Sequence, residues 1–155
     1  MRGLLVVAAM LVGQLGQLDG PVKAPKQHVM YVAEAQTVAA GKKAVLELRF
    51  RVDDGYHVNS HTPKSELQIA TALSLGVSDG VKVAAMEYPA GKEYSFAFDP
   101  SEKLDVYSDD FVVRVPVVAT AGPHELKGEL KYQACDKAAC YPPRTLPVDV
   151  VFTAK

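Results

Sequence analysis

The sequence predicts an all-β fold, an immunoglobulin-like antiparallel β-sandwich. Seven or eight short segments either alternate apolar and polar residues or are rich in valine, and turn signals separate them at the spacing typical of a sandwich. The 155 residues fit one such domain together with a targeting segment. Hydrophobic residues make up 48% of the chain and charged residues 23%, which argues against wholesale disorder.

The first residues have the pattern of a secretory signal peptide. Arg2 precedes an apolar run over residues 4–12, and this run is shorter than the ~20 residues that a transmembrane helix needs. We expect residues 1–20 to be a signal peptide without a clear cleavage site, and residues 21–28 to be a flexible lead-in to a domain that spans 29–155. A buried helix or an uncleaved anchor is the alternative. Export would place the domain in the periplasm or another oxidising compartment, where disulfides persist.

Four segments predict strands most clearly, and each has one apolar face. Residues 44–52 alternate strictly, with leucine, phenylalanine and valine on one side and charged residues on the other. Residues 111–118 are rich in valine and include Pro116, which predicts an edge strand or a β-bulge. Residues 124–133 alternate again, and residues 146–152 place apolar side chains on one face of a last strand.

Four weaker strand candidates are residues 29–38, 56–60, 66–75 and 81–88. Residues 66–75 fit the helical period about as well as the strand period, so a helical turn is the alternative there. Turn signals separate the candidates along the chain, such as Asp-Asp-Gly at 53–55.

The composition excludes several classes of protein. Lys plus Arg number 17 and Asp plus Glu number 18, and this balance argues against a nucleic-acid binder and against a polybasic membrane-surface module. Two cysteines exclude both a disulfide-dense small scaffold and a four-cysteine zinc site within one chain. The chain has no Ser-His-Asp pattern, no glycine-rich phosphate loop and no paired carboxylates of the glycosidase kind, which weakens a hydrolase interpretation.

The two cysteines, Cys135 and Cys140, flank the tip of the hairpin expected between the last two strands. Opposed residues of an antiparallel pair have Cα atoms ~4.5–5.5 Å apart, within the ~4.4–6.8 Å that disulfides prefer, so a bridge is geometrically easy. Alternation places Cys135 on the solvent-facing register, whereas Tyr132 and Ala134 fall on the core register. An exposed pair can undergo disulfide exchange, and it can equally be a stabilising staple, so the residues alone support both roles about equally.

The residues around the cysteines resemble those of a known family. The run Tyr-Gln-Ala-Cys at 132–135 and the run Cys-Tyr-Pro-Pro at 140–143 are similar to the cysteine block of the N-terminal periplasmic domain of the thiol:disulfide interchange protein DsbD. That family carries this block on an immunoglobulin-like sandwich. Weaker matches follow in the same order at residues 55–60, 88–92 and 106–107, and the similarity spans about 29–153.

The resemblance implies a thiol–disulfide exchange domain that relays two electrons without a cofactor, because the dithiol itself carries them. Such a domain would accept electrons from a membrane-embedded donor and reduce oxidised thioredoxin-like periplasmic proteins. The resemblance also implies that Cys140 forms the mixed disulfide with the partner and that Cys135 resolves it.

The chain departs from the family pattern in two respects. Four residues separate its cysteines, whereas the best-known member has five. It has no second cysteine pair, no multi-helix membrane domain and no thioredoxin domain. We therefore expect a stand-alone domain or a fragment, monomeric, whose electron donor is a separate protein. The alternative function is a non-catalytic immunoglobulin-like interaction domain with a structural hairpin disulfide.

Five side chains are expected around the cysteine pair, namely Phe96, Phe98, Tyr132, Tyr141 and His57. In the resembling family a loop aromatic caps the cysteines, so Phe96 or Phe98 would shield the disulfide from other thiols. The alternative is that these aromatics alternate onto the core face of a strand.

His57 has two further interpretations. With His61 and the cysteines it would complete a zinc site, but the Cys-x4-Cys spacing and an oxidising compartment disfavour that site. Otherwise His57 is a partly buried strand residue whose ring hydrogen-bonds to nearby backbone. At the hairpin tip, Asp136 and Lys137 are either solvated turn residues or charges that act on the thiols.

Overall fold

The computed structural model describes residues 26–155, and all regular elements in this range are β-strands. Within the described range, no helix is long and apolar enough to cross a membrane. The strands are β1 (Val29–Val32), β2 (Gln36–Val38), β3 (Ala44–Val52), β4 (His57–Asn59), β5 (Ala72–Leu75), β6 (Val81–Val83), β7 (Lys92–Phe96), β8 (Asp99–Tyr107), β9 (Phe111–Ala119), β10 (Gly122–Tyr132), β11 (Ala134–Cys135) and β12 (Arg144–Ala154).

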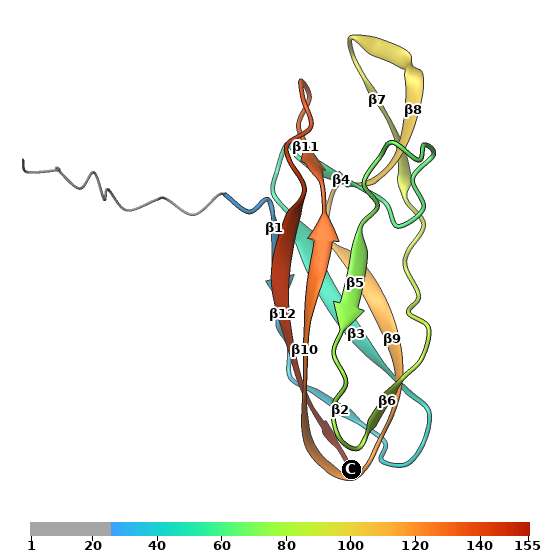
Figure 1. Ribbon diagram of the computed structural model, residues 1–155, viewed down its shortest axis with the longest axis vertical. Helices are drawn as coiled ribbons and strands as arrows, with labels where there is room; N and C mark the ends of the chain where they lie inside the picture. Colours follow the sequence, from blue (N-terminus) through green and yellow to red (C-terminus); the bar gives the residue numbers. More distant parts are fainter. Residues whose placement is uncertain (1–25) are drawn as a thin grey trace, which may run out of the picture.

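The strands form three four-stranded sheets, and two of them pack face to face as a sandwich (Figure 1). One face of the sandwich has the order β1-β3-β9-β6, and the other has the order β2-β12-β10-β5. The third sheet, β11-β4-β8-β7, lies at the end of the sandwich opposite the C-terminus. In Figure 1 the β7–β8 hairpin and the turn after β11 both project from this end. The expected immunoglobulin-like sandwich is confirmed.

Alternating side chains build the main core. In β3, Leu46, Leu48 and Phe50 are completely buried, whereas Glu47 and Arg51 are exposed. Strands β10 and β12 pair over their whole length and direct their own apolar faces into the same cluster. Each fully buried side chain of this size contributes roughly 1.5–3 kcal/mol to folding. The strands expected at residues 44–52, 124–133 and 146–152 are therefore confirmed, with small shifts at their ends.

The expectation that Pro116 marks an edge strand or a bulge is wrong. Strand β9 lies between β3 and β6, and its registers with both neighbours are regular. The Pro116 carbonyl accepts a hydrogen bond of 2.9 Å from the Ala84 amide, just after β6 has ended at Val83. Since a residue of an antiparallel strand directs its N–H and C=O to the same side, the missing N–H of proline faces the end of β6 and costs no bond to β3.

The weaker candidates form shorter strands than the pattern predicts. Residues 29–38 divide into β1 and β2, and residues 81–88 contribute only the three residues of β6. Within 66–75, the strand alternative holds for β5, and no helix forms there. The hairpin of β7 and β8 was not expected as a strand pair. The expected signal peptide at residues 1–20 lies outside the described residues.

Replacing Val150 with alanine tests the sandwich core. Val150 and Val151 are neighbours in β12, but Val150 is fully buried whereas Val151 is 57% exposed. We expect Val150→Ala to lower the free energy of unfolding by about 2 kcal/mol, because two methyl groups leave a close-packed core. Val151→Ala is the matched control and should cost about 0.5 kcal/mol. Urea denaturation of both variants measures the difference, and equal losses would contradict the alternation of faces.

Candidate functional site

The two cysteines close the tip of the hairpin that joins β11 to β12. Cys135 and Cys140 lie opposite each other as an antiparallel bridge and form a disulfide with a Cα–Cα separation of 3.9 Å. Backbone hydrogen bonds flank the pair, from the Asp136 amide to the Ala139 carbonyl and from the Tyr141 amide to the Ala134 carbonyl. The expected hairpin bridge is confirmed.

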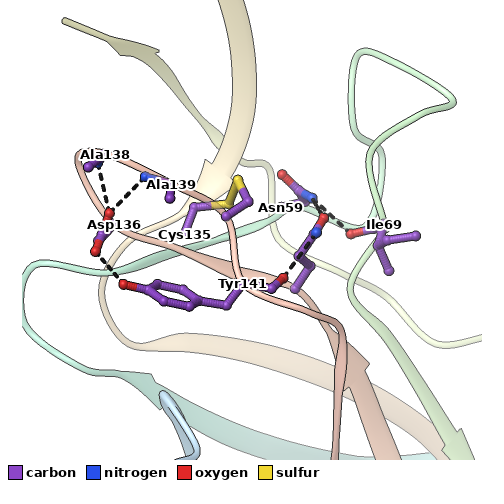
Figure 2. The surroundings of a disulfide bond; sticks show 9 residues. Asn59, Ile69, Cys135, Asp136, Ala138, Ala139 and Tyr141 are labelled. Carbon is purple, nitrogen blue, oxygen red and sulfur yellow. Dashed lines mark hydrogen bonds between the residues drawn. A yellow bond between two sulfur atoms is a disulfide. The ribbon is translucent and has the colours of Figure 1, made fainter.

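Asp136 holds the four-residue turn between the cysteines (Figure 2). One carboxylate oxygen accepts hydrogen bonds from the amides of Ala138 and Ala139, at 2.7 and 2.9 Å. The other oxygen accepts one from the Tyr141 hydroxyl at 2.6 Å. The Tyr141 hydrogen bond, followed by the two amide bonds, lowers the pKa of Asp136 to about 2, and the same carboxylate raises the pKa of Tyr141 to about 12. Asp136 is thus a turn residue whose ionised side chain shapes the loop.

A second set of hydrogen bonds anchors the hairpin to the third sheet. The Gln133 side-chain amide donates to the Tyr141 carbonyl at 3.1 Å. The Asn59 side-chain amide in β4 donates to the Ile69 carbonyl at 3.0 Å and to the Gln133 side-chain oxygen at 3.4 Å (Figure 2). The hairpin is therefore tied to β4 and to the loop that precedes β5.

The two cysteines differ sharply in exposure. Cys140 is exposed, whereas Cys135 is completely buried. The expectation that Cys135 faces solvent is therefore wrong, although its register does direct it away from the main core. Cys135 belongs instead to a second small cluster with Phe96, Leu104 and Val106. The β7–β8 hairpin covers the face of β11 that the alternation predicted to be exposed to solvent.

Phe96 and Phe98 occupy different positions at this cover. Phe96 is only 7% exposed and packs in the cluster of Cys135. Phe98 is 68% exposed, and its ring stacks on Phe96 with centroids 4.8 Å apart. Tyr94, two residues before Phe96 in β7, also packs against this cluster. The sequence signal that could have placed Tyr94 beside Phe96 was the alternation along β7, because residues i and i+2 share a face.

His57 lies directly opposite Cys135 in the β4–β11 pair. Its ring centroid lies 4.0 Å from that of Tyr94 and 5.9 Å from that of Phe96. The expected hydrogen bond from its ring to the backbone is absent at Nε2, which is buried without a partner in the described part of the chain. Burial lowers the pKa of His57, and the Asp136 carboxylate acts against this shift.

The remaining expected residues lie outside the small cluster that contains Cys135. Tyr132 lies in the main core, where its hydroxyl bonds to the Gln27 side chain. Tyr141 follows Cys140 and is partly buried beside Tyr56. His61 stacks on Tyr88 and bonds to the Thr71 carbonyl, so it does not join His57. Over residues 26–155 no group of three or more His, Cys, Asp or Glu side chains could hold a metal ion.

Comparisons with known proteins give one family match. A family model described as the N-terminal part of the thiol:disulfide interchange protein DsbD matches residues 26–151. A comparison with curated proteins finds no significant match.

Several solved structures are similar in fold. The N-terminal periplasmic domain of ScsB from Proteus mirabilis has a TM-score of 0.53 and 14% identity, covering 79% of this chain and 44% of that chain. The reduced DsbD N-terminal domain from Neisseria meningitidis has a TM-score of 0.46 and 22% identity, with coverages of 70% and 81%. The complex between the DsbD and PilB N-terminal domains from the same organism has a TM-score of 0.48 and 21% identity, with coverages of 86% and 88%.

Replacing Asp136 with asparagine tests the electrostatics of the turn. The pKa of Asp136 is lowered from 3.8 to about 2. The ionised carboxylate therefore stabilises the fold above pH 3.8, and this stabilisation is lost as the pH falls towards 2. We expect Asp136→Asn to melt at a lower temperature than the wild type at pH 7, and the difference to shrink between pH 4 and pH 2. Asp54→Asn, in an exposed turn, is the control, and a difference independent of pH would contradict the assignment.

Proposed function

Because the chain belongs to the family of the N-terminal domain of the thiol:disulfide interchange protein DsbD, its function is thiol–disulfide exchange, and we propose that its two cysteines have distinct roles in that exchange. Cys140 forms the mixed disulfide with a partner protein, and Cys135 resolves it. The dithiol relays two electrons and requires no cofactor.

The unequal exposure of the cysteines is the observation that supports these roles. A thiolate that attacks another protein's disulfide must approach it closely, and exposed Cys140 at the hairpin tip meets this requirement. Buried Cys135 is bonded to the Cys140 sulfur and has no solvent-accessible surface through which another protein could reach it. The hydrogen bonds that Asp136 accepts and that Gln133 donates hold the loop, so the resolving attack is intramolecular and needs little rearrangement.

The exchange balances as two successive substitutions at sulfur. In the reduced domain, the Cys140 thiolate attacks a partner disulfide and releases one partner thiolate. Cys135 then attacks the Cys140 sulfur and releases the second partner thiolate, which regenerates the disulfide of the structure. The domain loses two electrons and the partner gains them.

We assign the partners by chemical class. The family is periplasmic, and residues 1–20 serve as the export signal in this proposal. The recipients are oxidised thioredoxin-like proteins of that compartment, in line with the complex of DsbD and PilB N-terminal domains. The electron donor is a separate membrane-embedded protein.

Phe96 has a protective role in this proposal. Phe96 belongs to the apolar cluster that covers Cys135, a protective layer, whereas the nearby Phe98 lies outside this cluster. Small thiols are thereby kept from the Cys135 sulfur, and attack on the oxidised domain is directed to Cys140.

Single cysteine variants test the two roles. We expect Cys135→Ala to accumulate a mixed disulfide with an oxidised thioredoxin probe through Cys140, because no second thiol is left to resolve it. Cys140→Ala should accumulate little, since its remaining thiol is buried. Non-reducing electrophoresis measures both, with the double variant as the control. Equal trapping by both variants would contradict the assignment. A wild-type reduction potential below about −300 mV would instead favour a structural disulfide in a non-catalytic interaction domain.

Phe96→Ala tests the protective layer. Glutathione attack on the wild-type disulfide should yield adducts on Cys140 almost exclusively. Removing the Phe96 ring uncovers Cys135, so the fraction of adducts on Cys135 should rise severalfold, and Phe98→Ala should cause a smaller rise. Mass spectrometry after acid quench and alkylation locates the adducts, and circular dichroism verifies that each variant is folded. An unchanged distribution in Phe96→Ala would remove the protective role.

A further inference from the structure

His57 is a buried ionisable side chain, and one of its two ring nitrogens, Nε2, makes no hydrogen bond within the described chain. The residue is 3% exposed. Leaving a buried polar atom unpaired costs folding free energy, so such atoms are uncommon and call for an explanation. Aromatic packing alone would be satisfied by phenylalanine or tyrosine at this position.

The position of His57 relates this nitrogen to the disulfide. His57 and Cys135 are direct partners in the antiparallel pair of β4 and β11, so their side chains share one face with Cβ atoms ~4.5–5.5 Å apart. Both side chains also meet Phe96, Cys135 within the small apolar cluster and His57 through its ring. Tyr94 covers the imidazole from the other strand. His57 therefore provides an unpaired proton acceptor on the face where Cys135 is shielded from water.

The resolving step requires such an acceptor. The nucleophile in disulfide exchange is a thiolate, and apolar surroundings such as those of Cys135 disfavour a charged sulfur. Exposed Cys140 can release its proton directly to solvent, whereas Cys135 has no solvent-accessible surface in the structure.

We propose that His57 accepts the proton of the Cys135 thiol when the reduced domain resolves its mixed disulfide, an inference that rests on the exchange function proposed above. The thiol proton moves to Nε2, and the sulfur electron pair forms the new bond to the Cys140 sulfur. The bond between Cys140 and the partner breaks, and the partner sulfur leaves with that electron pair. The imidazolium then returns its proton to the leaving thiolate or to water, and the partner disulfide is the oxidant.

The surroundings of His57 favour both the uptake of the proton by the neutral ring and the stabilisation of the imidazolium that results. Burial lowers its pKa, so the ring is neutral at pH 7 and able to accept a proton. Asp136 follows Cys135 in the chain, and its carboxylate favours the imidazolium once the proton has moved. Asp136 remains ionised throughout, because its own pKa is about 2.

The carboxylates of Asp105 and Glu93 on the packed strands have partners of their own. Asp105 of β8 accepts a hydrogen bond from the Ser60 hydroxyl at 2.6 Å. Glu93 of β7 pairs with Lys64 at 3.0 Å and with Lys103 at 3.5 Å. The acceptor role therefore falls to His57 and not to a carboxylate of the cover.

Stopped-flow kinetics with 5,5′-dithiobis(2-nitrobenzoate) separates the two steps. The reduced domain should release the coloured thiolate in two phases, first by Cys140 attack and then by Cys135 resolution. We expect His57→Gln, which cannot take up a proton, to leave the first phase intact and to slow the second about a hundredfold at pH 7, the low end of general-base effects. His124→Gln is the matched control, because His124 lies in β10 and bonds to the Thr120 carbonyl away from the cysteines.

The pH profile separates a proton acceptor from a packing residue. In the wild type, the second phase should rise as the pH increases through the pKa of His57, which lies below 6.5, since only the neutral ring accepts a proton. His57→Gln should lack this rise, and its rate should approach the wild-type rate only as the pH climbs well above the pKa of ~8.5 of an ordinary thiol, because the buried thiol then ionises without a base. A variant slowed equally at every pH, or not slowed, would overturn the inference while the exchange function stands. Absence of the first phase in the wild type would overturn both.

A measurement on the wild-type protein covers the case in which the variant does not fold. Nuclear magnetic resonance titration of the histidine rings should show that reducing the disulfide shifts the pKa of His57, and the His124 ring signals serve as the internal reference. An unchanged His57 titration would overturn the inference.

Discussion

The pairing of β11 with β4 is the interaction on which the site depends. Its register places Ala134 opposite Val58 in the main core and Cys135 opposite His57 on the other face. Since successive strand residues point to opposite faces, a slip of one residue would bury Cys135 in the sandwich and turn it away from the cover. Strand β4 also pairs with β8, so the same short strand brings the covering β7–β8 hairpin to the disulfide.

The two sulfurs thus lie in opposite environments within one small loop. Apolar side chains exclude water from Cys135, whereas the Cys140 side of the loop is open and is held by hydrogen bonds. The Asp136 carboxylate accepts three hydrogen bonds at once, two from backbone amides and one from the Tyr141 hydroxyl. The hairpin tip can therefore be accessible to a partner and still have a defined conformation. On the buried side, His57 provides a polar ring nitrogen near the apolar cluster of Cys135.

Sequence patterns were informative where a strand buries one face against the main core. Strands β3 and β10 alternate clearly because their apolar sides meet the opposite sheet, and the cysteine block after β10 indicated the hairpin and its bridge. The β7–β8 pair escaped detection because its strands pair mainly with each other and contribute to the small cluster around Cys135 more than to the main core. The edge-strand prediction from Pro116 was wrong for a related reason. Strand β6 ends just before it would need a hydrogen bond from the N–H that proline lacks, and the sequence does not show where β6 ends.

The sequence by itself determined the sandwich, the cysteine pair at a hairpin tip and the residues through which the chain resembles an exchange family. These features depend on the local alternation of apolar and polar residues, on turn residues and on the short spacing between the cysteines, and each of these can be seen directly in the sequence. The tertiary structure alone shows that Cys135 is the buried cysteine and that Phe96, not Phe98, packs on it. It also shows that His57, the partner of Cys135 in β4, has a buried ring nitrogen without a hydrogen-bond partner among the described residues. Alternation says which of two faces a side chain takes, but whether that face meets water depends on a hairpin about 40 residues away in the chain.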